Sequence, residues 1–122
     1  MTKDNETSIH ELKEKIKSFC EARDWDQFHN AKDLAIALSI EASELLEHFR
    51  WKNEQEVGAL FEIPEKREKI EDEMADVLYF LVRLSQMYNI DLSESLNRKM
   101  EKNNKNYPVE KSKGSNKKYS EL

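Results

Sequence analysis

Two pairs of acidic residues interrupt the most apolar stretches of this chain. Glu41 and Glu44 lie within LAIALSIEASELLEHFRW, and Glu73 and Asp76 lie within IEDEMADVLYFLVRL. Residues three apart share one face of an α-helix, with Cβ atoms about 5–6 Å apart. Because apolar residues recur at helical spacing around each pair, both pairs are predicted to face a helix–helix interface.

Four carboxylates at such an interface need a positive partner. They repel one another and lose hydration, which is unfavourable unless something positive compensates. Hard divalent cations take oxygen ligands, so Mg²⁺ or Mn²⁺ suits a set made only of carboxylates. The two pairs therefore predict a divalent metal site.

Two other interpretations compete with this one. With 37% charged residues, acidic pairs also arise on solvated helix faces, where they bind nothing. A ferritin-like di-iron site needs Glu-x-x-His, but His48 follows Glu44 by four residues. The sequence contains no EF-hand loop, Cys/His zinc pattern or glycine-rich phosphate loop.

The fold is predicted to be all-α, because only 2 Gly and 2 Pro leave little punctuation for a β-rich chain. Helical periodicity and start signals predict four helices. They cover about 9–23 after the Ser8 capping box, 31–50 after Asn30, 64–88 from Pro64, and from the Asp91 cap to before Pro108. Residues 52–63 are predicted to be a polar connection with a short turn near 57–61, and the chain after 108 to be irregular.

The second and third helices are apolar on more than one side, over residues 34–40 and 77–81. A helix of this kind must be buried on several faces. One layer of helices from this chain cannot cover both, so self-association is predicted.

Composition narrows the class further. A chain of 122 residues is expected to form one domain, and a net charge of −5 argues against a nucleic-acid partner. The single cysteine, Cys20, cannot form an intramolecular disulfide. With neither a hydrophobic signal region nor an apolar run of spanning length, the protein is expected to avoid the membrane and to be cytoplasmic.

Four segments together resemble one known family. They are RDWDQFH, the Glu41-x-x-Glu44 helix ending in FRW, the Glu73-x-x-Asp76-V-L helix, and KMEKNNKNYPVEKSKGSNKKYSEL. The chain resembles the MazG-like all-α nucleoside triphosphate pyrophosphohydrolases, and within them the dCTP pyrophosphatase branch. The resemblance implies a four-helix bundle over residues 1–108, assembled as a dimer or a dimer of dimers, with a polar tail over 109–122 that could close over the nucleotide.

The resemblance also implies a reaction. A (deoxy)nucleoside triphosphate, most favourably dCTP or a modified analogue, would be cleaved between its α- and β-phosphates to the monophosphate and pyrophosphate. Glu41, Glu44, Glu73 and Asp76 would be the ligands of Mg²⁺, with Mn²⁺ as an alternative. Because no Ser, Cys or His is placed as a nucleophile, water activated by the metal would attack, with Glu41 or Glu44 as the base.

Several side chains are expected around the nucleotide. They are Trp25, Gln27, His29, Trp51 and Phe80 near the base and sugar, and Lys99, Asn103 and Lys113 or Lys117 near the phosphates. A tryptophan is more often a core residue than a base platform, and exposed lysines are often only solvated. The vertebrate members have His where this chain has Ile16 and Tyr where it has Phe80, which predicts a relaxed base preference.

Two other functions stay open at this level. One is a helical dimerisation or interaction module without catalysis, in which the carboxylates are only surface. The other is a metal-dependent hydrolase of a different phosphoanhydride.

Overall fold

The computed structural model describes residues 2–122, and within them the chain is helical without strands. Six α-helices and three short 3-10 turns make up this part. The α-helices are α1 (Ile9–Ala22), α2 (Ala31–Glu47), α3 (Glu54–Leu60), α4 (Pro64–Met87), α5 (Leu92–Asn106) and α6 (Val109–Ser112). The 3-10 turns are Asp4–Glu6, Asp26–Phe28 and Tyr119–Glu121. The all-α prediction is confirmed.

Side-chain caps begin the helices where the sequence predicted. Ser8 Oγ accepts from the Glu11 N–H at 3.1 Å, which completes a capping box with the Glu11 carboxylate. The Asn30 amide oxygen accepts a hydrogen bond at 2.9 Å from the third residue of α2, and Asp91 accepts one at 2.8 Å at the start of α5. Pro64 opens α4, where its missing N–H needs no partner.

Two of the six helices were expected as turn or irregular chain. The segment Glu54–Leu60 is a full helix, because Asn53 and Glu56 form a second capping box around its first turn. After Pro108, residues Val109–Ser112 form one helical turn, although an irregular tail was predicted from residue 109 onward. Four helices are therefore too few for the described residues, but the four predicted ones are the four longest.

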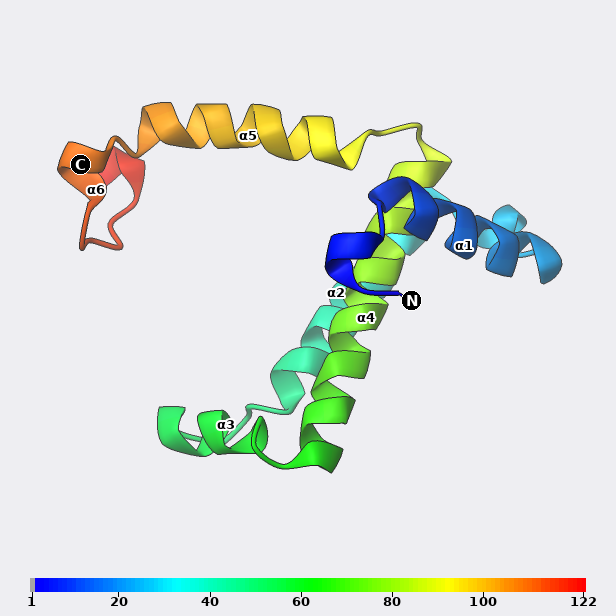
Figure 1. Ribbon diagram of the computed structural model, residues 1–122, viewed down its shortest axis with the longest axis horizontal. Coiled ribbons are helices and arrows are strands. Elements are labelled where there is room, and N and C mark those ends of the chain that lie inside the picture. Colours follow the sequence, from blue (N-terminus) through cyan, green and yellow to red (C-terminus); the bar gives the residue numbers. More distant parts are fainter. Residues whose placement is uncertain (1) are drawn as a thin grey trace. The chain divides into compact units, whose positions relative to one another are not determined.

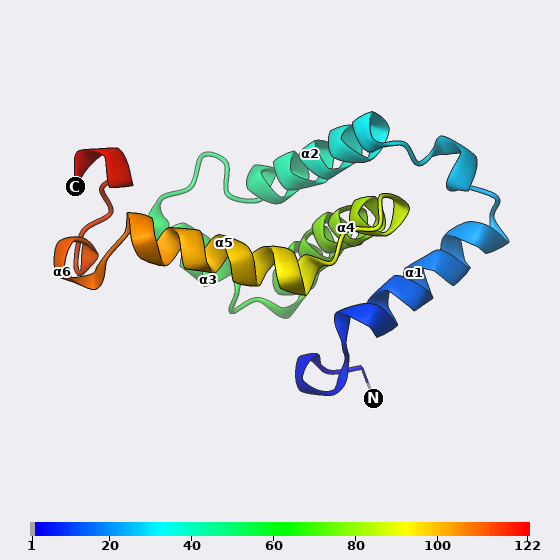
Figure 2. The same ribbon diagram turned by 90° about the horizontal axis from the view of Figure 1, so that it is seen from above.

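The chain divides into two compact units, the first ending at Asn89 and the second running from Ile90 to Leu122. In the first unit, α2 and α4 lie side by side and run in opposite directions, as the two views in Figures 1 and 2 show. The α1 helix packs against α4 as well. This antiparallel pair sets the positions of Glu41, Glu44, Glu73 and Asp76.

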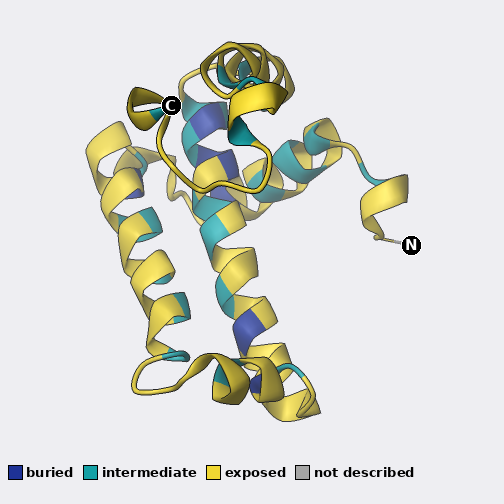
Figure 3. Cartoon of the chain, turned by 90° about the vertical axis from the view of Figure 1, so that its left-hand side faces the viewer, coloured by how far each residue is buried: buried dark blue, intermediate teal, exposed yellow. Residues whose placement is uncertain are grey.

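The buried residues are few and concentrate on α4, as the colours in Figure 3 show. Ile70 and Val82 are buried there, together with Arg83 and Ser85, and Leu34 is the buried residue of α2. Large apolar side chains on the same two helices are exposed: Ile36, Ile40 and Leu46 on α2, and Met74, Leu78 and Leu81 on α4. Among residues 2–122, no helix is both long and apolar enough to cross a membrane.

Candidate active site

Three of the four predicted carboxylates meet between α2 and α4. Glu41 comes from α2, and Glu73 and Asp76 come from successive turns of α4. One carboxylate oxygen of each lies within 4.8 Å of the other two. Because the helices run antiparallel, an i,i+3 pair on one faces a pair on the other, and this geometry produces the cluster.

Within residues 2–122, no positive charge lies among the three converging carboxylates of this cluster. Glu41 Oε2 and Glu73 Oε2 are buried and, within the described residues, have no hydrogen-bond partner. Burial raises the pKa of Glu41 to about 7, helped by a hydrogen bond with Glu44 and by the charges of the neighbouring acids. Unpartnered buried oxygens among like charges are unfavourable by themselves, and they fit the ligand set of a hard divalent cation.

Glu44 lies beside this cluster rather than in it. Its carboxylate is close enough to help raise the pKa of Glu41, but it is not among the three that converge. It is exposed and lines a cavity of about 260 Å³ with Glu47, His48 and Glu73. The His48 Nε2 atom lies 3.8 Å from Glu73 Oε1, a contact that the sequence analysis did not anticipate.

A larger cavity of about 370 Å³ opens next to the carboxylates. Glu41 and Asp76 form its acidic wall, and Lys15 supplies a positive charge. The remaining wall is apolar and aromatic: Ile16, Phe19, Trp25, Tyr79 and Phe80. A flat ring can stack on such a wall while a phosphate chain reaches the acidic side, where a cation would neutralise it.

The aromatic side chains of this wall hold one another edge to face. Phe19 meets Trp25 with ring centroids 5.6 Å apart and Tyr79 with centroids 6.1 Å apart. Tyr79 meets Phe80 at 4.9 Å. Such pairs contribute about 0.5–1.5 kcal/mol each beyond their buried area, so the wall keeps its shape.

Two predicted substrate residues line this cavity, and three others in the first unit do not. Trp25 and Phe80 are in its wall. The Gln27 amide donates to the backbone oxygen and to the carboxylate of Asp24, both at 3.0 Å. His29 Nδ1 accepts from Arg83 Nε at 2.9 Å.

Trp51 is in the connection between α2 and α3. Its side chain is 86% exposed, and the Arg50 guanidinium lies 4.9 Å from its ring centroid. The backbone of Trp51 has φ = 64°, a left-handed conformation that bulky residues adopt only at a free-energy cost.

The predicted phosphate ligands belong to the second unit. Lys99 and Asn103 lie on α5, one turn apart, and Lys113 and Lys117 follow α6. Their roles toward the nucleotide stay predictions.

Sequence reasoning missed three side chains that line this cavity: Lys15, Phe19 and Tyr79. The Tyr79 hydroxyl is 3.1 Å from the Sγ atom of buried Cys20, and burial together with this contact raises the pKa of Tyr79. Phe19 lies in the first predicted helix, over about residues 9–23, and was given no role in the site. Its position one turn from Ile16 was the available signal, because both side chains lie on one face of α1.

Comparison with known proteins identifies the family of the chain. The model of the MazG-like family matches residues 36–122, which contain all four predicted metal ligands. The chain belongs to the MazG-like family. The resemblance noted in the sequence is confirmed, and so is the dCTP pyrophosphatase branch within the family.

This MazG-like chain is similar to several proteins that are named as pyrophosphatases. The dCTP pyrophosphatase 1 of Mus musculus is 37% identical over 117 residues, which cover 96% of this chain and 69% of that protein. The dCTP pyrophosphatase 1 of Homo sapiens is 35% identical over the same shares. The chain also matches the crystal structure of a pyrophosphatase from Archaeoglobus fulgidus, over 82% of this chain and 92% of that one. The two share 38% of their sequence, and the structures superpose with a TM-score of 0.77.

Proposed function

We propose that this MazG-like protein is a Mg²⁺-dependent pyrophosphohydrolase of nucleoside triphosphates, and that dCTP or a modified analogue is its preferred substrate. The products would be the nucleoside monophosphate and pyrophosphate, so the enzyme would remove surplus or non-standard nucleotides. The observation that carries the proposal is the carboxylate cluster of Glu41, Glu73 and Asp76, of which Glu41 and Asp76 line an aromatic cavity.

Glu41, Glu73 and Asp76 would hold the metal, because their oxygens converge and two of those residues have a buried oxygen without a partner. When bound, Mg²⁺ would offset the charge of the triphosphate and favour ionisation of an attacking water. Mn²⁺, with the same preference for oxygen ligands, is an alternative.

Glu44 is the better candidate for the base. It lies outside the three converging carboxylates, is exposed, and is close enough to Glu41 to help raise the pKa of that residue. A carboxylate in this position can accept the proton of a water molecule that attacks the α-phosphorus. Glu41 would then orient Glu44 and hold the metal.

The aromatic wall would bind the base. Trp25 offers a ring for stacking, and Lys15 lies where it can neutralise part of the phosphate charge. Ile16 and Phe80 carry no hydroxyl or imidazole to read the edge of the base. Selectivity for cytosine over other bases is therefore expected to be modest, because a pocket without polar contacts discriminates weakly.

The chain is proposed to work as a homodimer or a dimer of dimers built on a four-helix bundle. The support is the row of exposed apolar side chains on α2 and α4, which includes Ile40 at 52% exposure and Leu46 at 67%. Large apolar patches of this kind mark protein–protein contacts. Residues 1–108 would form the catalytic domain, and the tail over 109–122 would close on the nucleotide. We also propose that the protein is cytoplasmic.

The test is a panel of nucleoside triphosphates incubated with Mg²⁺, with pyrophosphate, orthophosphate and monophosphate quantified separately. Pyrophosphate and dCMP should accumulate in equal amounts from dCTP. Orthophosphate as the first product would place the cut at the terminal phosphate and overturn the proposal. No hydrolysis of any triphosphate by the folded protein would leave the interaction-module reading in its place.

A further inference from the structure

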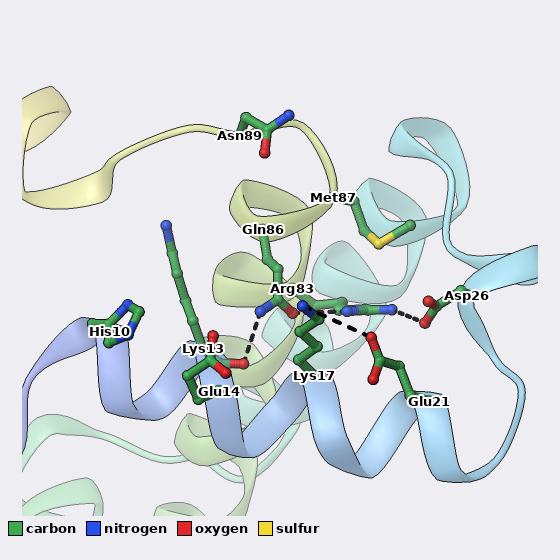
Figure 4. Close-up of a pocket in the computed structure, with 10 residues that line it drawn as sticks. All are labelled: His10, Lys13, Glu14, Lys17, Glu21, Asp26, Arg83, Gln86, Met87 and Asn89. Atoms are coloured by element: carbon green, nitrogen blue, oxygen red, sulfur yellow. Dashed lines mark hydrogen bonds and ion pairs between the residues drawn. The ribbon is translucent and has the colours of Figure 1, made fainter.

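A buried arginine connects α4 to the turn between α1 and α2. The Arg83 side chain is 1% exposed, although it carries a permanent charge. Its Nε donates to His29 Nδ1 at 2.9 Å, and its Nη1 donates to Gln86 Oε1 at 2.7 Å. Its Nη2 forms an ion pair with Asp26, which Figure 4 shows reaching across from the turn between α1 and α2.

This network fixes the turn that carries Trp25. Asp26 begins the short 3-10 turn Asp26–Phe28 and His29 follows it, and both bind the Arg83 guanidinium. Gln86 extends the network, because its amide nitrogen donates to the Lys13 carbonyl of α1 at 2.8 Å. Arg83 therefore connects α4 to both ends of the turn and, through Gln86, to α1.

His29 passes this constraint to the wall of the cavity. Burial, and after it the charge of Arg83, lower the pKa of His29, so the ring is neutral at pH 7 and can accept at Nδ1. The His29 ring meets the Trp25 ring edge to face, with centroids 6.4 Å apart. Trp25 also meets Phe19, in the cavity wall, and the Arg23 guanidinium lies 6.0 Å from its ring centroid.

We propose that Arg83 is a positioning residue for the nucleotide base: it fixes Asp26 and His29, and through them it sets the place of Trp25 in the cavity wall. This inference rests on the proposed function for its kinetic test, but the position of Trp25 can be measured without any substrate. The buried charge on α4 is retained for this purpose, because an apolar residue at position 83 would pack in the same place without holding the turn.

The test compares Arg83→Met and Arg83→Lys with a control, Arg67→Met, which removes an arginine from an exposed ion pair with Glu71 on the same helix. Steady-state kinetics on dCTP give KM and kcat. Acrylamide quenching in a Trp51→Phe background reports on Trp25 alone.

Arg83→Met should raise KM about tenfold, lower kcat much less, and make Trp25 more accessible to the quencher, because small misplacements of binding groups weaken ground-state contacts. Arg83→Lys should restore little, since an ammonium cannot bind three partners in a fork. Arg67→Met should match wild type in all measurements. A folded Arg83→Met with wild-type KM and wild-type quenching would overturn the inference.

Asp26→Asn keeps the test decisive if Arg83→Met does not fold. The Asp26 side chain is 47% exposed, so the fold should tolerate this substitution. This variant should show the same changes in KM and quenching at smaller size, and unchanged values would overturn the inference. If wild type cleaves no triphosphate, the proposed function fails, while the quenching of Trp25 still decides the role of Arg83.

Discussion

The imidazole Nε2 of His48, on the residue that caps α2, lies 3.8 Å from Glu73 Oε1 on α4. The other oxygen of Glu73 is buried and has no hydrogen-bond partner among the described residues. One carboxylate thus faces a histidine on one side and the acidic cluster on the other. In the proposed metal site, His48 would be an outer residue that orients Glu73.

Replacing His48 by Ala should weaken metal binding without abolishing it. Loss of a residue that orients a ligand typically costs about 10–100-fold in metal affinity. The Mg²⁺ concentration at half-maximal activity should therefore rise by about tenfold, with activity recovering at saturating Mg²⁺. An unchanged Mg²⁺ titration would mean that the contact with Glu73 has no such role.

Glu73→Gln and Glu44→Gln should separate metal binding from base catalysis. Wild type should gain about 2.7 kcal/mol of stability at a hundredfold excess of Mg²⁺ over Kd. Glu73→Gln should lose activity and most of this gain, yet be at least as stable as wild type in EDTA, because it removes one repelling charge. Glu44→Gln should lose most activity and keep most of the gain.

Melting temperatures with EDTA and with Mg²⁺ measure these effects, and Glu47→Gln is the matched control. Glu47 is on the same helix, 65% exposed, and paired with Arg50. Equal melting curves for wild type and Glu73→Gln under both conditions would contradict the metal site.

Without metal, the raised pKa of Glu41 should make stability fall as pH rises. The pKa is about 7 in the folded state, against an ordinary value of 4.5. Between these values the folded state binds the extra proton, so this contribution is complete below about pH 4.5 and is lost by about pH 7. Denaturation in EDTA should show wild type losing stability relative to Glu41→Gln over this range. Parallel pH profiles for the two proteins would contradict the raised pKa.

Trp25→Ala should weaken nucleotide binding. Stacking of a base on an aromatic ring is worth about 1–3 kcal/mol, or about 5–150-fold in affinity. We expect KM for dCTP to rise within that range and kcat to change less. Phe28→Ala is the control, since Phe28 is in the same turn, 61% exposed and outside the cavity wall. A wild-type KM for Trp25→Ala would make this tryptophan a packing residue.

Introducing polar groups into the cavity should sharpen the choice of base. Phe80→Tyr adds a hydroxyl and Ile16→His adds an imidazole, both at positions in the wall. A site that hydrogen-bonds the substrate rejects analogues that cannot reciprocate. The ratio of kcat/KM for dCTP to that for dTTP should increase in one or both variants. An unchanged ratio in both would show that the base edge does not meet these positions.

Much of the fold could be predicted because its signals are local. The caps at Ser8, Asn30 and Asp91 and the proline at position 64 define helix starts through contacts within four residues. The carboxylate cluster could also be predicted, since two i,i+3 pairs in apolar stripes need only an antiparallel helix pair to meet. The α3 helix was underestimated because its capping box begins at Asn53, in a segment with little apolar periodicity.

The contacts that depend on tertiary structure were not visible. Arg83 reads as one charge in an apolar run, and its three partners come from the turn after α1 and from its own helix. Tyr79 reads as one more apolar residue, although its hydroxyl meets Cys20 from α1. Neither set of contacts can be predicted from residue spacing or composition in the sequence, because each depends on how α1 packs against α4.

The acidic cluster occupies the interface where α2 and α4 would otherwise form an uninterrupted apolar seam. A protein selected only for stability would have leucine or isoleucine at positions 41, 73 and 76, and such a variant should be more stable and inactive. Stability and catalysis thus place opposite demands on the same three positions. The carboxylates at these positions lower the stability of the metal-free protein, and a bound cation would restore that stability only in the state that is ready for catalysis.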